Sequence, residues 1–235
     1  MITVAPREGG GCNRSSARLP AAPAFAGATS LLARPSAYVG WMVTPAPSLP
    51  REFSQLSLAE AAELLAARKL PPVDEWHPER EGDSAMEIRT DGSWYHEGGR
   101  INRPAMVRLF STILRREPDG GYVLVTPAEK LVIAVEDTPF RAVEMKSEGE
   151  GTGRKLVFRL DTDDLVMADA GHPLSFGNDA DNPDPRLHVR GTIGNGLEAR
   201  IDRALYYDVV ELAIADGAEP PAIWSNGTRF PLVDA

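Results

Sequence analysis

Hydrophobic residues recur at spacings of three and four in three segments of the chain, a pattern typical of helices with one buried face. The three stripes are Leu58, Ala61, Ala62 and Leu65; Met106, Val107, Leu109, Phe110, Ile113 and Leu114; and Leu205, Tyr206, Val209, Leu212 and Ala213. The second stripe covers more than half of a helix circumference. We therefore expect the second helix to be the central buried one.

Residues with capping side chains precede each stripe. Ser57 and Glu60 have the spacing of a capping box, in which each side chain satisfies an amide at the helix start. Asn102 and Asp202 stand before the second and third stripes and are the predicted N-caps. The basic pair Arg115–Arg116 suits the negative end of the second helix, which is expected to extend that far.

Short runs rich in β-branched and aromatic residues lie between turn residues and predict strands. The runs are Met86–Ile88, Trp94–Glu97, Tyr122–Thr126, Leu131–Glu136, Arg141–Lys146, Lys155–Asp161, Leu165–Ala168, Leu187–Arg190 and the final hairpin Ala222–Leu232. Between the last single strand and the third helix, Gly191–Gly196 reads as a flexible loop. The pattern predicts an α+β fold of two small subdomains, each a helix packed on a mainly antiparallel sheet.

The chain divides into three parts by composition. Residues 1–50 are rich in Ala, Pro, Gly, Ser and Arg at no steady hydrophobic period, which predicts a disordered extension. The alternative is that Met42 is the true start and residues 1–41 are not translated. We assign residues 51–138 to an N-terminal subdomain with a leading helix and residues 139–235 to a C-terminal subdomain.

One short motif occurs twice in front of a predicted helix. The triplet Ile101–Arg103 reads Ile-Asn-Arg, and Ile201–Arg203 reads Ile-Asp-Arg, a shift of 100 residues. The predicted strands Tyr122–Val125 and Ala222–Ser225 align at the same shift. This echo predicts two subdomains related by an internal repeat, with a chance match between two ordinary strand-helix-strand units as the alternative.

Several motifs of the folded region are specific as a set. They are Asp91-Gly92-x-Trp94, Gly99-x-Ile101-x-Arg103-Pro104, Leu109-Phe110, Leu114-Arg115-Arg116, Tyr122-x-Leu124-Val125-Thr126-Pro127-x-Glu129-Lys130, Val135-Glu136-Asp137-x-Pro139-Phe140, His172-Pro173-Leu174, Leu187-x-Val189-Arg190-Gly191 and Trp224-Ser225-x-Gly227, with Phe230-Pro231-Leu232 at the end. With these motifs the chain resembles the bacterial domain of unknown function 1285 family, DUF1285, from about Pro71 to Leu232. The resemblance implies two α+β subdomains with a repeated motif and a part in signalling, without an established activity.

Composition and charge exclude several function classes. The hydrophobic fraction of 43% and charged fraction of 25% are those of a globular protein. A net charge of -9 repels phosphate backbones and anionic lipid, so neither a nucleic acid nor a membrane is an expected partner. The one cysteine, Cys12, allows no intramolecular disulfide and fits a cytoplasmic location.

Known catalytic and metal-binding motifs do not occur in the sequence. His77, His96, His172 and His188 lack the spacing of a zinc helix and are interpreted as surface or capping groups. No Gly-x-Ser-x-Gly elbow is present, and the acidic run Asp161–Asp164 is interpreted as a solvated turn. The acidic run 179–184 is interpreted in the same way, and no cofactor is expected.

Six polar residues lie at the ends of the central predicted hairpin and at the start of the second helix. They are Arg103, Thr126, Glu129, Lys130, Glu136 and Asp137. If the helix packs on the hairpin, Arg103 can face a carboxylate, or the group can line a pocket for a polar ligand. The alternative is a structural ion-pair network that fixes helix against sheet.

Three functions remain open at this point. The first is a non-catalytic regulatory or signalling module that binds a small polar ligand or a protein partner. The second is an enzyme of unassigned type, such as a hydrolase that uses Glu129, Glu136 or Asp137 as acid or base. The third is a structural role as a homo-oligomer, since Phe230, Pro231 and Leu232 are expected to be exposed.

Overall fold

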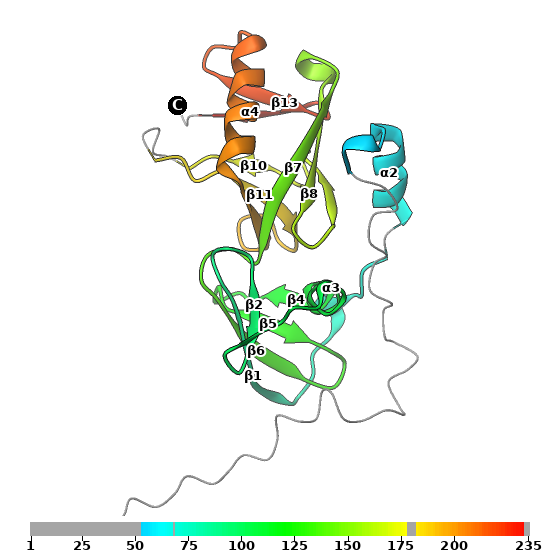
Figure 1. Ribbon diagram of the computed structural model, residues 1–235, viewed down its shortest axis with the longest axis vertical. Coiled ribbons are helices and arrows are strands. Elements are labelled where there is room, and N and C mark those ends of the chain that lie inside the picture. Colours follow the sequence, from blue (N-terminus) through cyan, green and yellow to red (C-terminus); the bar gives the residue numbers. More distant parts are fainter. Residues whose placement is uncertain (1–52, 68, 178–181, 233–235) are drawn as a thin grey trace, which may run out of the picture. The chain divides into compact units, whose positions relative to one another are not determined.

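The computed structural model describes residues 53–67, 69–177 and 182–232, which all belong to one compact unit. Two six-stranded sheets, a two-stranded hairpin and three α-helices make up this part of the chain (Figure 1). The predicted disorder of residues 1–50 concerns a segment outside the described residues.

Sheet A is built from the first six strands, in the spatial order β3-β2-β1-β6-β5-β4. They are β1 Glu81–Ile88, β2 Trp94–His96, β3 Gly99–Arg100, β4 Leu114–Arg116, β5 Tyr122–Val125 and β6 Lys130–Val135. β1 and β6 are parallel neighbours, and the other pairs are antiparallel. Sheet A therefore consists of two antiparallel three-stranded meanders that join at one parallel pair.

Sheet B repeats this arrangement with the next six strands, in the order β10-β11-β12-β7-β8-β9. They are β7 Phe140–Glu148, β8 Lys155–Leu160, β9 Leu165–Met167, β10 Leu174–Ser175, β11 Arg186–Arg190 and β12 Leu197–Ile201. Here β7 and β12 form the parallel pair between two antiparallel meanders. The predicted α+β class with mainly antiparallel sheets is confirmed.

The two sheets have the same topology, since the first strand of each pairs in parallel with the sixth. This equivalence relates β1–β6 to β7–β12, and it does not follow the sequence echo. The echo aligns α3, Pro104–Thr112, with α4, Arg203–Ala215, yet α3 lies between the third and fourth strands of sheet A while α4 follows the sixth strand of sheet B. The shift of 100 residues therefore does not relate equivalent strands.

Helix α3 differs from its prediction at both ends and in its burial. Its N-cap is Arg103, one residue after the predicted Asn102, and the helix ends at Thr112. The following Leu114–Arg116 is β4, because it pairs with β5 and buries Leu114 completely. Only Ser111 and Thr112 of α3 are buried, so the helix is not the central buried element that its apolar stripe predicted.

The leading helix α2, Leu58–Ala67, packs against sheet B. Its start has the predicted capping box, in which Glu60 accepts from the Ser57 amide at 2.8 Å and Ser57 Oγ accepts from the Glu60 amide at 3.2 Å. Leu58 and Ala61 form a small core with Val157 of β8 and Leu165 of β9. The predicted N-terminal subdomain of residues 51–138 includes this helix, whereas its buried face contacts strands of sheet B.

The C-terminal hairpin joins β13, Ala222–Ser225, to β14, Thr228–Pro231. The chain reverses at Asn226 and Gly227 as predicted, and both residues have positive φ. Phe230 and Leu232 are buried in the main core, where they pack with residues of both sheets. The expected exposure of these two side chains was wrong, and Pro231 alone of the three is exposed.

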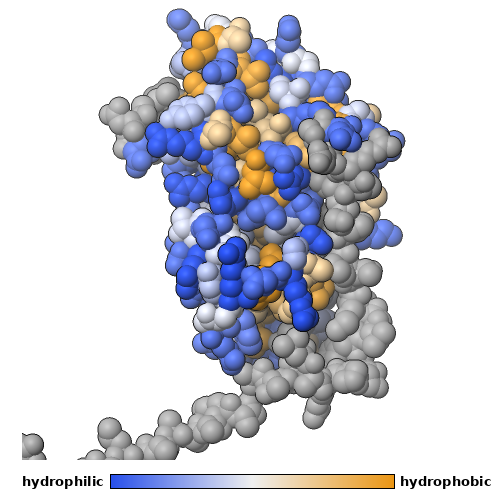
Figure 2. Space-filling view, in the orientation of Figure 1, coloured by the Kyte–Doolittle hydropathy of each residue, from blue (hydrophilic) through white to orange (hydrophobic). Residues whose placement is uncertain are grey.

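Five large hydrophobic residues of the described chain are exposed, and two of them lie on α4. They are Leu70, Val132, Ile193, Tyr207 and Ile214. On the face drawn in Figure 2, hydrophobic residues form separate groups within a largely hydrophilic surface. Single exposed hydrophobic residues are normal in globular proteins, so the homo-oligomer stays a prediction.

Candidate functional site

The six residues predicted from the sequence fall into separate groups. Thr126, Glu129 and Lys130 lie at the β5–β6 turn, whereas Glu136 and Asp137 follow the other end of β6. Because a strand rises about 3.3 Å per residue, the two ends of β6 are roughly 17 Å apart. These carboxylates therefore do not converge around one cleft, as the hydrolase alternative requires.

The turn group makes local structural contacts. Thr126 Oγ1 accepts from the Glu129 amide at 3.2 Å, and Glu129 lies 3.5 Å from the Arg80 guanidinium. Lys130 Nζ lies 2.6 Å from Glu81 and 3.5 Å from a second carboxylate, that of Glu117. The hydrogen bond to Glu81 raises the pKa of Lys130. This group connects the turn to its neighbouring strands.

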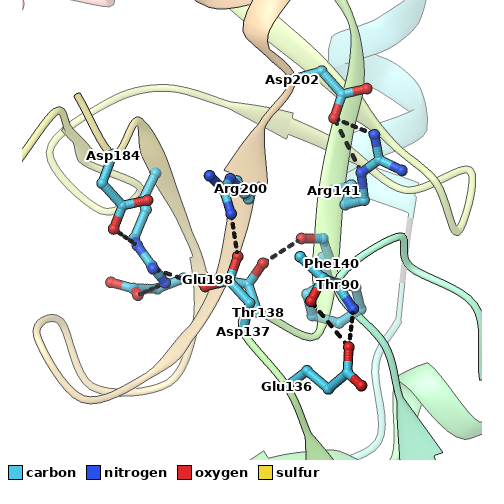
Figure 3. A network of polar contacts seen from close by, with 11 residues as sticks. Thr90, Glu136, Asp137, Thr138, Phe140, Arg141, Asp184, Glu198, Arg200 and Asp202 are labelled. Atoms are coloured by element: carbon cyan, nitrogen blue, oxygen red, sulfur yellow. Dashed lines mark hydrogen bonds and ion pairs between the residues drawn. The ribbon is translucent and has the colours of Figure 1, made fainter. Parts of the chain in front are cut away.

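At the other end of β6, Glu136 fixes the β1–β2 turn (Figure 3). Its Oε2 accepts from the Thr90 amide at 2.9 Å and from Thr90 Oγ1 at 3.0 Å. The bond from the Thr90 amide lowers the pKa of Glu136. A lowered pKa favours the charged form of Glu136, which suits its role as an acceptor for the turn.

Asp137 lies between two arginines of sheet B (Figure 3). Its two carboxylate oxygens accept from Arg186 Nη2 and Arg200 Nη1, each at 2.9 Å. Arg186 also pairs with Asp184 at 2.7 Å. This network agrees with the structural alternative for Asp137. Arg103 takes no part in it: the side chain is exposed and has no ion pair among the described residues.

A pocket lies elsewhere, between the β1–β2 turn, the start of α3 and the β8–β9 turn. We call it the Trp94 pocket; its volume is about 300 Å³. The lining residues are Asp91, Gly92, Ser93, Trp94, Arg100, Ile101, Asn102, Pro104, Val107, Arg108, Asp161 and Thr162. None of the six predicted site residues is among them, although Arg103 stands between two lining residues in the sequence.

The wall of the Trp94 pocket is rigid and partly apolar. Trp94 is buried in the main core with 1% of its surface exposed, and Ile101 and Val107 pack against that core. Arg108 is held by Asp163, with 3.0 Å between Nη1 and Oδ2, and Asp163 in turn binds Arg159. Arg108 therefore acts as a fixed part of the wall.

The β1–β2 turn brings the backbone close to Asp161. Gly92 has φ of +79°, and a Cβ at this position would stand 2.4 Å from Asp161 Oδ2. Glycine is therefore required here by the turn and by the carboxyl group next to it. Asp91 of the same turn accepts from the side chain and the amide of Ser93, which lowers the pKa of Asp91.

The Asp161 carboxyl group has an unusual environment. Its side chain reaches solvent through the pocket, yet the protein atoms around the carboxyl group desolvate it and raise its pKa to about 7. The carboxyl group accepts a hydrogen bond from the Arg141 amide, at 3.2 Å. The Arg141 guanidinium binds Asp202 Oδ1 at 2.7 Å and the Asp91 carbonyl oxygen at 2.8 Å. The Arg141 guanidinium therefore binds other acceptors, although its positive charge still opposes the rise in the pKa of Asp161.

Two exposed polar residues at the pocket have no partner in the described parts of the chain. The Arg100 guanidinium makes no ion pair or hydrogen bond there, and neither does the Asn102 side chain. The pocket therefore presents a guanidinium and a carboxyl group that form no ion pair with another described residue, although Arg100 acts on Asp91 and Arg141 acts on Asp161 through their charges.

The histidines and the other polar clusters do not form a metal centre. In residues 53–67, 69–177 and 182–232, no group of three or more His, Cys, Asp or Glu side chains could hold a metal ion. His188 is buried, which lowers its pKa, and its Nε2 lies 3.2 Å from the Gly191 carbonyl oxygen. Of the two interpretations given for His188, the surface group was wrong, while the contact with the Gly191 carbonyl oxygen agrees with a capping group. No helix of the described residues is long and apolar enough to span a membrane.

The sequence contained part of the signal for the Trp94 pocket. Two of the sequence motifs, Asp91-Gly92-x-Trp94 and Gly99-x-Ile101, contribute residues to the lining of the pocket. Neither motif predicts that Asp161 lies next to them in the fold. The run Asp161–Asp164 was interpreted as a solvated turn, whereas Thr162 and Asp164 are buried and Asp163 binds two arginines. Sequence spacing could not show that this turn lies beside the β1–β2 turn.

Comparisons with known proteins give one consistent result. Residues 71–138 match the family profile described as "Domain of unknown function (DUF1285), N-terminal domain". Residues 139–232 match the profile described as "Protein of unknown function (DUF1285), C-terminal domain". No curated protein matches the chain.

Two crystal structures of DUF1285 family proteins are similar to the chain. The protein from Silicibacter pomeroyi DSS-3 is 37% identical, with a TM-score of 0.61, over 76% of this chain and 96% of that chain. The protein from Shewanella baltica OS155 is 25% identical, with a TM-score of 0.42, over 54% of this chain and 90% of that chain. The first of these matches agrees with the family resemblance found in the sequence.

Proposed function

The chain belongs to the DUF1285 family, whose domains have unknown function, and we propose that it is a non-catalytic module that binds a small polar ligand in the Trp94 pocket. A regulatory or signalling role is part of the same proposal. The observation that carries it is the presence in one pocket of two charged side chains, Arg100 and Asp161, that form no ion pair with another described residue.

Three features of the pocket support ligand binding. Its volume of about 300 Å³ is at the lower end of the range for small-molecule sites. Its wall combines apolar surface from Ile101 and Val107 with a few polar groups, as binding sites commonly do. A carboxyl group with a strongly shifted pKa is also enriched at functional sites.

A catalytic function is the second candidate, and one observation favours it. Asp91 and Asp161 line the same pocket, and their surroundings lower the pKa of the first and raise that of the second. Pairs of carboxyl groups with separated pKa values serve as acid and base in many hydrolases. The catalytic carboxylates of this candidate are Asp91 and Asp161, whereas the hydrolase predicted from the sequence uses Glu129, Glu136 or Asp137. If the protein is an enzyme, incubating it with the bound compound should yield a product.

The proposal is tested by a thermal-shift screen of the full chain against amino acids, organic acids, sugar phosphates, nucleotides and metal ions. A ligand at about one hundred times its Kd should raise the melting temperature by roughly 5–10 °C, because it binds the folded state alone. Mass spectrometry of each positive mixture then distinguishes binding from turnover.

Two matched variants locate the bound compound. Asn102→Phe places a ring in the pocket from an exposed lining residue, whereas Ala105→Phe adds the same ring at an exposed residue outside the lining. We expect the ligand-induced rise to vanish in Asn102→Phe and to persist in Ala105→Phe. A screen without any positive compound, or a rise that Asn102→Phe leaves unchanged, would overturn the proposal.

A further inference from the structure

We propose that the Trp94 pocket binds a small zwitterion of the α-amino acid class, with its ammonium group against Asp161 and its carboxylate against Arg100. The inference rests on the proposed function, because it names the ligand class of the same pocket. It follows from two charged groups of the lining that form no ion pair with another described residue: Asp161 on the β8–β9 turn and Arg100 on β3.

The surroundings of the Asp161 carboxyl group favour a cationic group of the ligand. Its carboxyl accepts from the Arg141 amide and makes no ion pair in the described parts of the chain. The guanidinium of Arg141 is committed to Asp202 and to the Asp91 carbonyl oxygen. The negative charge of Asp202 further disfavours an isolated carboxylate at Asp161. A ligand cation would relieve this repulsion and supply the missing hydrogen-bond donors.

The cation is an ammonium group rather than a metal ion. Hard metal ions such as Ca²⁺ need six or more oxygen ligands, and Mg²⁺ needs near-octahedral geometry. In the described residues no cluster of three or more His, Cys, Asp or Glu side chains is available to any metal ion. An ammonium group needs only a few acceptors, which Asp161 and neighbouring oxygen atoms can provide.

The Arg100 guanidinium favours an anionic group of the ligand. Its side chain is exposed at the pocket and has no partner within the described residues. Guanidinium groups bind carboxylates through two parallel hydrogen bonds, a geometry that an α-carboxylate fits. Asn102, which also lacks a partner, stands two residues further along the same wall and adds a donor.

The apolar part of the wall suits the ligand's side chain. Ile101, Pro104 and Val107 lie beside the charged groups, and Trp94 closes the pocket from the core. The volume of about 300 Å³ admits an amino acid and leaves little room for a nucleotide. We therefore expect amino acids with apolar side chains to bind better than those with charged ones.

The proton balance of Asp161 distinguishes an ammonium ligand from a purely anionic one. The charged groups near its carboxyl are Arg141 of β7, Asp202 before α4, Asp91 of the β1–β2 turn, Arg100 and Arg108 from the pocket wall, and Asp163 and Asp164 of its own turn. An ammonium group favours the carboxylate form, so its binding releases protons near neutral pH. An anion placed next to Asp161 favours the protonated form, so its binding takes protons up.

The experiment uses the full chain and three related probes. The twenty L-amino acids are first screened by thermal shift, and the best is compared with its deaminated acid and its decarboxylated amine by calorimetry. Removing either charge should weaken binding about tenfold or more, because each removes charged hydrogen bonds. Titrations in buffers of different ionisation enthalpy should show release of about half a proton per amino acid at neutral pH, given the pKa of about 7 for Asp161.

Paired variants assign the two charges. Asp161→Asn should weaken the amino acid and the amine, abolish proton release and leave the deaminated acid unaffected. Arg100→Gln should weaken the amino acid and the acid without changing proton release. The controls are Asp74→Asn and Arg103→Gln, which alter exposed residues outside the pocket lining and should leave all affinities unchanged.

The outcomes separate this inference from the proposed function. In one outcome, amino acids give no response, and a compound of another class binds to the wild type but not to Asn102→Phe. This result would overturn the inference that the ligand is a zwitterion and leave the proposed function intact. Proton uptake, or an amino acid affinity that Asp161→Asn does not change, would also overturn it. If no compound class binds, both proposals fail together.

Discussion

At the scale of the residue, Asp161 shows how neighbouring elements can change the chemistry of an ordinary side chain. The β1–β2 turn places Gly92 against its carboxyl, while Arg141 offers an amide and directs its guanidinium elsewhere. Desolvation then outweighs the hydrogen bond, and the pKa rises to about 7. With this pKa the carboxyl group is partly protonated at neutral pH, so it can either donate or accept a hydrogen bond.

This shift predicts a pH dependence of stability. The pKa of the Asp161 carboxyl is about 7 in the folded protein and about 4 in the unfolded chain. Between these two pH values the carboxyl keeps its proton in the folded state and has lost it in the unfolded state. Raising the pH through this window therefore lowers the free energy of unfolding. Asp161→Asn removes the effect, so the variant should gain stability relative to the wild type between about pH 5 and about pH 8.

Urea denaturation of the wild type and of Asp161→Asn, at about pH 5 and about pH 8, measures the difference in their free energies of unfolding. The contributions of all other titrating groups are the same in the two proteins and cancel. Asp74→Asn, at an exposed residue, serves as the control and should show no such change. An equal difference between wild type and Asp161→Asn at both pH values would mean that the carboxyl titrates normally.

At the scale of the element, the C-terminal hairpin depends on one buried hydroxyl group. Ser225 of β13 is fully buried; its Oγ accepts from the Leu156 amide at 2.9 Å and donates to the Ala168 carbonyl oxygen at 2.6 Å. These two backbone groups belong to the start of β8 and the end of β9. The hydroxyl therefore joins β13 to sheet B, and α4 packs against the same strand (Figure 1).

Ser225→Ala should destabilise the fold by roughly 1–3 kcal/mol, because it leaves a buried amide and a buried carbonyl group without a partner. Chemical denaturation gives the change in free energy, and hydrogen exchange at Leu156 shows whether the loss is local. Ser147→Ala, an exposed serine on β7, is the control and should stay within about 0.5 kcal/mol of the wild type. Equal stabilities of the two variants would contradict the role of the hydroxyl.

At the scale of the whole molecule, one hydrophobic core includes residues of both sheets. Leu114 and Leu124 of sheet A and Leu187 and Leu197 of sheet B belong to the same cluster of buried residues. The β11–β12 loop adds polar links, since Asn195 Nδ2 donates to the Glu117 carbonyl oxygen at 3.2 Å. The described part of the chain is therefore expected to unfold as a unit, in spite of its repeated topology.

Calorimetry should accordingly show a single transition with equal calorimetric and van't Hoff enthalpies. Leu114→Ala in sheet A and Leu187→Ala in sheet B both empty fully buried positions, and each should cost about 2–5 kcal/mol. In each variant, amide exchange should accelerate in both sheets. Two transitions, or acceleration confined to the substituted sheet, would mean that the sheets unfold independently.

The local pattern determined much of the fold. The Ser57–Glu60 capping box and the Asn226–Gly227 turn formed as predicted, because each depends on residues close together in the chain. The family and the α+β class also followed from the sequence, since the motifs and the alternation of strands with helices are local properties. Leu114–Arg116 was assigned wrongly to a helix, because its pairing with β5 outweighs its helical spacing.

Tertiary structure alone decided the candidate site. Residues on β6 that were predicted to form one group are separated by the length of the strand, while Asp161 and Trp94, 67 positions apart in the chain, line the same pocket. Burial and charge at such a point depend on which turns the sheets bring together. The sequence by itself therefore determined the family, the α+β class and those elements that depend on local residues. The packing of the turns determined which side chains can meet a ligand, because both desolvation and ion pairing act through space.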